Sequence, residues 1–189
     1  MSIKPWIKVG EPQTLVTRWE KRLADQRFID HRGKEVQYTL FGGKIASIVL
    51  PVTEDKKVVA IRQFRAGAND IVIELPGGTS DHEGESPEDV MVRELEEETG
   101  YRAGRIIKLF PEKLYFDPAS SMDHFHGFLA LDCRLVNAQK LDSTENIEIF
   151  TVPLKDWVRF VQEEVSDAKA TALTIKALPH LNIRTELVL

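Results

Sequence analysis

The chain has 189 residues, of which 42% are hydrophobic, so it is long enough to bury the core of one compact domain. Its formal net charge of −5 argues against broad nucleic-acid binding, because such binding depends on Lys and Arg neutralising phosphates. The amino terminus has no charged-then-apolar leader and no apolar run approaches about 18 residues, so we expect neither secretion nor membrane insertion. Cys133 is the single cysteine, which excludes an intrachain disulfide and fits a cytoplasmic enzyme.

The amino-terminal part of the chain is rich in strand-forming residues. Residues 1–45 are expected to form a β-rich extension with two strand candidates, Thr14–Thr17 and Glu35–Leu40. Two apolar, β-branched runs follow, 46–52 and 58–64, and the polar residues between them predict a hairpin. A further strand over 70–75 leads into a Gly-Gly turn.

A carboxylate-rich helix is predicted directly after that turn. Ser86 can cap the helix, and Pro87 suits the first helical position because its missing N–H would have been unpaired there. Asp89 completes a near capping box, and Gly100 can adopt the left-handed conformation that ends a helix. We therefore predict a helix over 87–99.

Three carboxylates of this helix share one face. Glu94, Glu97 and Glu98 fall at i, i+3 and i+4, while Met91 and Leu95 lie on an adjacent apolar arc. Two charges about 4 Å apart repel by roughly 1 kcal/mol in water and about 4 kcal/mol at an effective dielectric near 20, so a counter-charge is required. Hard oxygen ligands without cysteine suit Mg²⁺ or Mn²⁺ better than zinc.

The alternative is an ordinary solvated helix face, since Glu is a good helix former. Arg93, four residues before Glu97, is placed to pair with that carboxylate and orient it. The Gly-Gly turn, the cap, this pairing and the stop glycine stand at mutually consistent spacings. These features together favour a site for a divalent cation that holds a diphosphate.

The second half of the chain completes an alternating pattern of strands and helices. In chain order we predict three strands and two helices, near 104–110, 123–133, 146–152, 154–165 and 167–178. Ser166 is expected to cap the last helix and Pro179 to end it. Mixed strands with one central and two carboxy-terminal helices imply a sheet between helical layers.

The pattern Glu85, Arg93-Glu94-Leu95, Glu97-Glu98 and Gly100-Tyr101 resembles the signature box of the Nudix hydrolases. One departure is an extra residue between Gly78 and Glu85, which we expect to lengthen the loop without moving the helical carboxylates. The resemblance implies a Nudix-type α/β/α sandwich with a mixed sheet. In that scheme residues 1–45 form a β-rich dimerisation extension and 46–189 the hydrolase domain.

Features outside the box resemble the subgroup of ADP-ribose and nucleoside-diphosphate-sugar pyrophosphatases. They are the run from Arg62 to Arg65, the run from Ile73 to Gly78, and Pro118, which lies one position beyond the usual offset from Tyr101. The resemblance implies that Arg65, Pro118 and Asp123 contact substrate. Arg65 could instead be a surface arginine at a strand end, Pro118 a strand terminator, and His126 on the same strand as Asp123 a packed histidine.

The resemblance also implies a set of metal ligands. These are the Gly77 carbonyl, Glu94 and Glu98, with Glu97 supporting them or binding a second ion. The catalytic base is expected from the acidic segment 142–148, with Glu145 preferred and Glu148 as the alternative. Together with Glu97 and Glu98, Glu145 would form the catalytic set.

The implied reaction is metal-dependent hydrolysis of ADP-ribose or a nucleoside-diphosphate sugar, giving a nucleoside monophosphate and a sugar phosphate. Mg²⁺ is the expected cofactor, with Mn²⁺ as an alternative. Two other readings remain open: a hydrolase of nucleoside triphosphates or dinucleoside polyphosphates, and a nucleotide-binding module without activity. A homodimer is expected by resemblance, and Trp6, Trp19 and Phe28 either stack on a bound base or serve packing.

Overall fold

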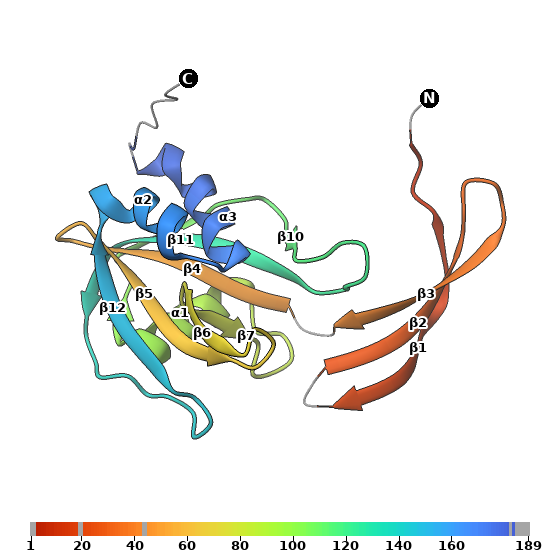
Figure 1. Ribbon diagram of the computed structural model, residues 1–189, viewed down its shortest axis with the longest axis horizontal. Helices are drawn as coiled ribbons and strands as arrows, with labels where there is room; N and C mark the ends of the chain where they lie inside the picture. Colours follow the sequence, from red (N-terminus) through yellow and green to blue (C-terminus); the bar gives the residue numbers. More distant parts are fainter. Residues whose placement is uncertain (1–2, 19–20, 43–44, 182, 184–189) are drawn as a thin grey trace. The chain divides into compact units, whose positions relative to one another are not determined.

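The computed structural model describes residues 3–18, 21–42, 45–181 and 183. The chain divides into two compact units, which Figure 1 shows. One unit combines the chain up to Ile45 with Tyr115–His124, and the other combines Ala46–Leu114 with the chain from Phe125 onward. No helix in the described ranges is both long and apolar enough to cross a membrane.

The first unit contains a three-stranded antiparallel sheet of order β1-β2-β3. Its strands are β1 (Ile7–Arg18), β2 (Lys21–Ile29) and β3 (Glu35–Gly42). The sequence pattern did not predict β2, because one of its two buried positions carries a polar side chain. Gln26 is 2% exposed, and its amide nitrogen donates to the carbonyls of Val9 and Arg27.

Asp30 organises the turn between β2 and β3. One carboxylate oxygen accepts the backbone N–H groups of Arg32 and Lys34 at 2.8 and 3.0 Å, and the other accepts Nε of Arg32 at 3.0 Å. The Lys34 N–H and the Arg32 contacts lower the pKa of Asp30 to about 2, against the opposing effect of burial.

We expect Asp30→Asn to destabilise the protein at neutral pH and to have little effect near pH 2. The folded-state pKa lies below the ordinary value of 3.8, so the stabilisation by the carboxylate is complete above pH 4 and is lost as the pH falls toward 2. Thermal unfolding of both proteins across that range measures the difference. An equal gap in Tm at pH 7 and pH 2 would contradict the assignment.

The second unit is built on a nine-stranded sheet with the order β10-β11-β4-β5-β12, in which β6 also pairs with β5, β7 with β4, and β8 and β9 with β11. The strands are β4 (Ile45–Thr53), β5 (Lys57–Arg65), β6 (Asp70–Glu74), β7 (Gly77–Thr79), β8 (Tyr101–Arg102), β9 (Arg105–Lys108), β10 (Leu114–Tyr115), β11 (His124–Leu135) and β12 (Ile147–Pro153). The helices are α1 (Pro87–Thr99), α2 (Leu154–Glu164) and α3 (Ala168–Ala177), followed by the 3₁₀ turn η1 (Leu178–His180).

Successive residues of β4 point into two different cores. Leu50 packs with Trp157 of α2 and Leu173 of α3, whereas its neighbour Val49 packs with Leu95 of α1. This alternation follows from the two-residue period of a strand. Figure 1 shows α2 and α3 on one face of this sheet and α1 on the other. The predicted α/β/α sandwich is therefore confirmed.

The ends of the helices follow their local chemistry. Helix α1 spans the predicted residues, with Ser86 Oγ accepting the Asp89 N–H at 3.2 Å and Gly100 at φ 74°. The predicted cap of α3 is wrong by one residue. Asp167 rather than Ser166 caps it, because its carboxylate accepts the Ala170 N–H at 2.9 Å and lies at the positive end of the helix.

Candidate metal and phosphate site on helix α1

The glycine turn is fixed between β4 and the last turn of α1. In the antiparallel pairing of β7 with β4, Gly77 lies opposite Ile48 and Gly78 opposite Ser47. The Gly77 N–H donates to Oε2 of Glu98 at 2.8 Å. Two residues of the expected metal-ligand set, Gly77 and Glu98, are thus in direct contact.

We expect Gly77→Ala to lower the free energy of unfolding by about 3 kcal/mol. Gly77 has φ 154°, and an added Cβ would collide with the backbone of Ser47 and Ile48, which cannot move without breaking the β4–β7 pairing. Gly78→Ala is the matched control, because the atoms nearest to its Cβ would be those of the Glu94 carboxyl group, the end of a side chain and not backbone. Denaturant unfolding measures both, and equal losses would contradict this explanation.

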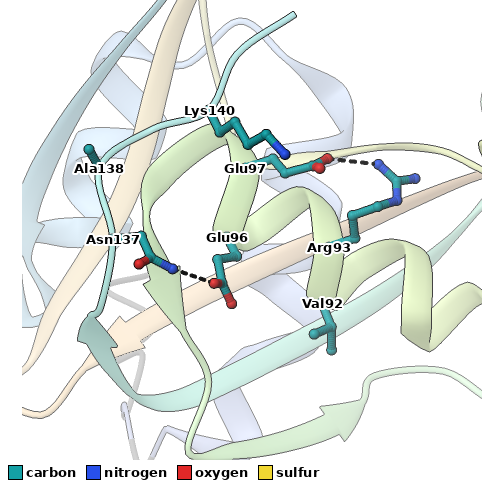
Figure 2. A pocket seen from close by; sticks show the side chains of 7 residues that line it. All are labelled: Val92, Arg93, Glu96, Glu97, Asn137, Ala138 and Lys140. Atoms are coloured by element: carbon teal, nitrogen blue, oxygen red, sulfur yellow. Dashed lines mark hydrogen bonds and ion pairs between the residues drawn. The ribbon is translucent and has the colours of Figure 1, made fainter.

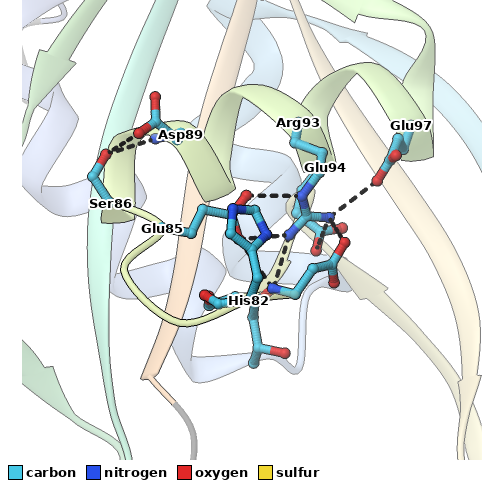
Figure 3. Close-up of polar contacts among 10 residues, drawn as sticks. His82, Glu85, Ser86, Asp89, Arg93, Glu94 and Glu97 are labelled. Carbon is cyan, nitrogen blue, oxygen red and sulfur yellow. Dashed lines mark hydrogen bonds and ion pairs between the residues drawn. The ribbon is translucent and has the colours of Figure 1, made fainter.

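Arg93 is the centre of the polar contacts in Figure 3. The predicted pair with Glu97 is present, with 3.0 Å between Nη1 and Oε2. The same guanidinium also bonds four groups that sequence spacing did not indicate: Glu85 at 3.0 Å, Glu94 at 3.0 Å, Asp81 at 3.3 Å and the Thr79 carbonyl at 2.9 Å. Arg93 therefore joins the glycine turn and its loop to the carboxylate face of the helix.

Glu85 anchors the loop that carries the extra residue. It accepts Nε of Arg93 and, through its other oxygen, the Asp81 N–H at 3.0 Å. These bonds, the one from Arg93 foremost, lower the pKa of Glu85 to about 2. The loop is held at Thr79, Asp81 and Glu85, so its extra length leaves Arg93 able to contact the helical carboxylates.

Burial raises the pKa values of the two innermost carboxyls of α1. Glu94 rises to about 7, with Arg93 opposing the effect. Glu98, which is 4% exposed, rises to about 8, with the Gly77 N–H opposing and the charges of Glu94 and Glu145 adding to the rise. Both groups bind a proton more readily than ordinary carboxylates, which is the electrostatic condition that a cation relieves.

Glu145 faces the same small cleft as the helical carboxylates. The cleft has a volume of about 90 Å³ and is lined by residues of α1, the loop before it and the acidic segment: Asp81, Arg93, Glu94, Glu97, Lys140, Asp142 and Glu145. Asp142 belongs to the acidic segment that was expected here, whereas Asp81 and Lys140 were not predicted to lie at the site. For these two, the one signal in the sequence was that each is a charged residue close to the Gly-Gly turn or to Glu145.

Glu148, the alternative base, is engaged elsewhere. It belongs to β12 and accepts from Arg62 Nη1 of β5 at 3.1 Å, and it does not line the cleft. The Arg62 guanidinium also lies 4.1 Å from the centre of the Phe150 ring. The structure therefore favours Glu145 over Glu148 as the carboxylate near α1.

Arg65 lies at the end of β5 and is tied to a buried carboxylate. Its Nε donates to Oε2 of Glu74 at 2.6 Å, and Lys169 Nζ of α3 donates to Oε1 at 3.0 Å. Glu74 is 3% exposed, so these two cations balance its charge. The Arg65 side chain remains 45% exposed, and its charge opposes the rise in the pKa of Glu98.

The remaining predicted substrate residues, Pro118 and Asp123, belong to the first compact unit, whereas the helical carboxylates belong to the second. Next to Pro118, Asp117 forms a turn by accepting the Ala119 N–H at 3.1 Å. The Asp123 carboxylate lies where a Cβ on Gly42 would be. His126, in the second unit, contacts the Glu112 carbonyl through Nδ1 at 2.8 Å.

The aromatic candidates for base stacking differ in their surroundings. Trp6 packs at 6.1 Å from the Tyr38 ring, and Phe28 packs edge-on against the same ring at the same distance. Trp6 is 39% exposed. The third candidate, Trp19, lies outside the described residues.

The donor set suits a hard divalent ion by its chemistry. Among the described residues, no three His, Cys, Asp or Glu side chains converge as metal ligands, and Arg93 lies between Glu94 and Glu97 instead. The donors are the carboxylate oxygens of Glu94, Glu97 and Glu98 and the carbonyl oxygen of Gly77, and burial raises the pKa values of Glu94 and Glu98. Such hard oxygens fit Mg²⁺ or Mn²⁺.

Comparison with known proteins agrees with this geometry. The NUDIX domain family matches residues 42–174. An ADP-ribose pyrophosphatase of Bacillus subtilis (strain 168) is 37% identical over 135 residues, covering 70% of this chain and 71% of the relative. A GDP-mannose pyrophosphatase of Escherichia coli (strain K12) is 33% identical over 140 residues, covering 69% and 71%.

A solved structure supports the same fold. The crystal structure of an ADP compounds hydrolase superposes with a TM-score of 0.79 at 18% identity, covering 96% of this chain and 97% of that one. The predicted fold class and the predicted family are both confirmed. The chain belongs to the Nudix family.

Proposed function

We propose that this Nudix protein hydrolyses the diphosphate bond of ADP-ribose or a nucleoside-diphosphate sugar, giving a nucleoside monophosphate and a sugar phosphate. The observation that carries the proposal is that Glu145 lies close enough to the helical carboxyls for its charge to raise the pKa values of both Glu94 and Glu98. A diphosphate with its cation would relieve that repulsion. Relatives named ADP-ribose pyrophosphatase and GDP-mannose pyrophosphatase support the substrate class.

In this proposal Glu94 and Glu98 hold Mg²⁺, with Glu97 and the Gly77 carbonyl completing the set. When bound, the ion supplies positive charge to the phosphate oxygens and acidifies a water molecule. Glu145 accepts the proton from the attacking water as general base. Arg93 keeps Glu94 and Glu97 oriented, and Arg65 offers its exposed guanidinium to a phosphate or ribose oxygen. Pro118 and Asp123 are assigned to the remainder of the substrate site.

The test is incubation of the full chain with Mg²⁺ and a panel of nucleotides, with the products resolved by chromatography. ADP-ribose is expected to give AMP and ribose phosphate, and GDP-mannose to give GMP and mannose phosphate. Parallel reactions with Mn²⁺ identify the preferred ion. Cleavage of triphosphates alone would replace the substrate assignment, and no cleavage of any compound would favour a binding module.

The structure gives a reason to prefer catalysis over simple binding. A binding module has no use for carboxylates that repel one another, whereas Glu98 is buried among such groups at 4% exposure. Hydrolysis of nucleoside triphosphates or dinucleoside polyphosphates would use the same metal ligands. The preference for diphosphate derivatives rests on Arg65 and Pro118 and on the relatives.

We also propose a cytoplasmic homodimer, in which residues 1–45 form the dimerisation extension and 46–189 the hydrolase domain. Several apolar side chains along β1 are exposed, among them Ile7 at 68% and Val16 at 49%, which suits contact with a second copy. Trp6 or Phe28 would then be available to a base bound by the partner. Light scattering of the full chain after size-exclusion chromatography measures the mass, and a monomer would contradict the dimer.

A further inference from the structure

The segment Val136–Lys140 covers the carboxy-terminal end of α1. The last four carbonyls of a helix have no partner within the helix, so groups from outside must supply their hydrogen bonds. Here the Lys140 N–H donates to the Glu97 carbonyl at 2.8 Å, and the Gln139 side-chain amide donates to the Glu98 carbonyl at 2.6 Å. Figure 2 shows Asn137, Ala138 and Lys140 beside the end of α1 that carries Glu97.

Gln139 makes a second bond that reaches further. Its amide nitrogen also donates to the carbonyl of Ile147, the first residue of β12, at 3.2 Å. A Gln side chain carries two N–H donors, so this one amide can serve both carbonyls. Gln139 is half-buried, whereas Asn137, Ala138 and Lys140 are all exposed. The side chain therefore bridges the end of α1 and the start of β12.

The bridge closes the loop that carries Glu145. Residues 141–146 connect Lys140 to Ile147. Before the loop, Lys140 and Gln139 bond the consecutive α1 carbonyls of Glu97 and Glu98. After it, the carbonyl of Ile147 is bonded by the same Gln139 amide. Within the loop, the Asp142 N–H donates to Oε2 of Glu145 at 3.0 Å, and the Glu145 N–H donates to the Asp142 carbonyl at 3.0 Å. These two bonds shape the loop but do not attach it to the helix.

We infer that Gln139 is a positioning residue, which holds the 141–146 loop against α1 and so keeps Glu145 in the cleft with Glu94 and Glu97. The inference rests on the proposed function only for the role of Glu145 as base. Without the amide, the carbonyls of Glu98 and Ile147 lose a shared donor, and the loop is attached to the helix chiefly through the Lys140 N–H. A base displaced by about 1 Å costs up to about a hundredfold in rate.

The test replaces Gln139 with Met, which has a similar length and no donor. We expect kcat for ADP-ribose with Mg²⁺ to fall roughly tenfold to a hundredfold, with KM unchanged within about twofold. Asn137→Ala is the matched control, because the Asn137 side-chain amide donates to the half-buried Glu96 carboxylate at 2.5 Å and not, as the Gln139 amide does, to the carbonyl of Ile147. Gln139→Lys keeps N–H donors at the negative end of the helix and is expected to restore most of the rate.

Two readouts separate positioning from a general loss of structure. In the double variant Gln139→Met with Glu145→Gln, the Met substitution should cause no further loss of kcat, because it acts through Glu145. Hydrogen–deuterium exchange of the amides in 141–147 should be faster in Gln139→Met than in the wild type, while the amides of α2 and α3 keep their protection.

The inference is overturned if hydrogen–deuterium exchange in 141–147 is unchanged in Gln139→Met. It is also overturned if the Met substitution lowers kcat in the Glu145→Gln background by the same factor as in the wild type. A wild-type protein that cleaves no nucleotide would refute the proposed function alone. Hydrogen–deuterium exchange in 141–147 would then test whether Gln139 holds the loop, because that measurement does not depend on enzymatic activity.

Discussion

Replacing Glu98 with Gln is expected to lower kcat by roughly a thousandfold, which corresponds to about 4 kcal/mol of lost transition-state stabilisation. A neutral amide is a poor ligand for a hard cation, so the substitution removes a carboxylate that the proposed mechanism requires. The fold should survive, because the amide oxygen can still accept the Gly77 N–H and the amide is uncharged, as the buried carboxyl mostly is at neutral pH in the metal-free protein with a pKa of about 8. The loss should therefore appear in turnover and not in Tm.

The measurement is kcat at saturating substrate over a Mg²⁺ titration, together with thermal unfolding of the metal-free proteins. Glu88→Gln is the matched control, since Glu88 is an exposed residue of the same helix and lies outside the cleft. It should retain wild-type turnover. Near-wild-type activity of Glu98→Gln with Mg²⁺ would show that the metal assignment is wrong.

Local signals were enough to predict α1 from the sequence. Its cap, first-turn proline and stop glycine are all within the helix or next to it, and the structure begins and ends the helix at the predicted residues. Strand β2 could not be predicted in the same way. The amide nitrogen of its inward-facing Gln26 donates to carbonyls that only the folded sheet supplies, so a polar residue interrupts the apolar alternation of the strand.

The same distinction between local and tertiary signals applies to the residues of the candidate site. The contact of Arg93 with Glu97 follows from helical spacing, whereas its contacts with Asp81 and Glu85 depend on how the preceding loop folds back. Lys140 and Gln139 reach α1 from another part of the chain, and no spacing rule brings them there. Sequence can therefore identify the helical carboxylates, but the residues that orient them need the tertiary structure.

The second large effect on kcat is expected from replacing the proposed catalytic base, Glu145, and not its alternative, Glu148. We expect Glu145→Gln to reduce kcat by about a hundredfold to a thousandfold, in the range of a lost general base. Glu145 lines the cleft with Glu94 and Glu97, and its charge raises the pKa values of Glu94 and Glu98. Because Gln cannot accept a proton, the rate should also lose the acid limb of its pH profile that belongs to the base.

Glu148→Gln is the matched comparison, as the same substitution three residues away. Glu148 lies on β12 and pairs with Arg62 at 3.1 Å, so its loss should cost at most a surface ion pair and leave kcat within about twofold. Profiles of kcat against pH for both variants and the wild type decide between them. A larger loss for Glu148→Gln than for Glu145→Gln would move the base from the loop to the strand, and the Gln139 bridge would then hold no catalytic group in place.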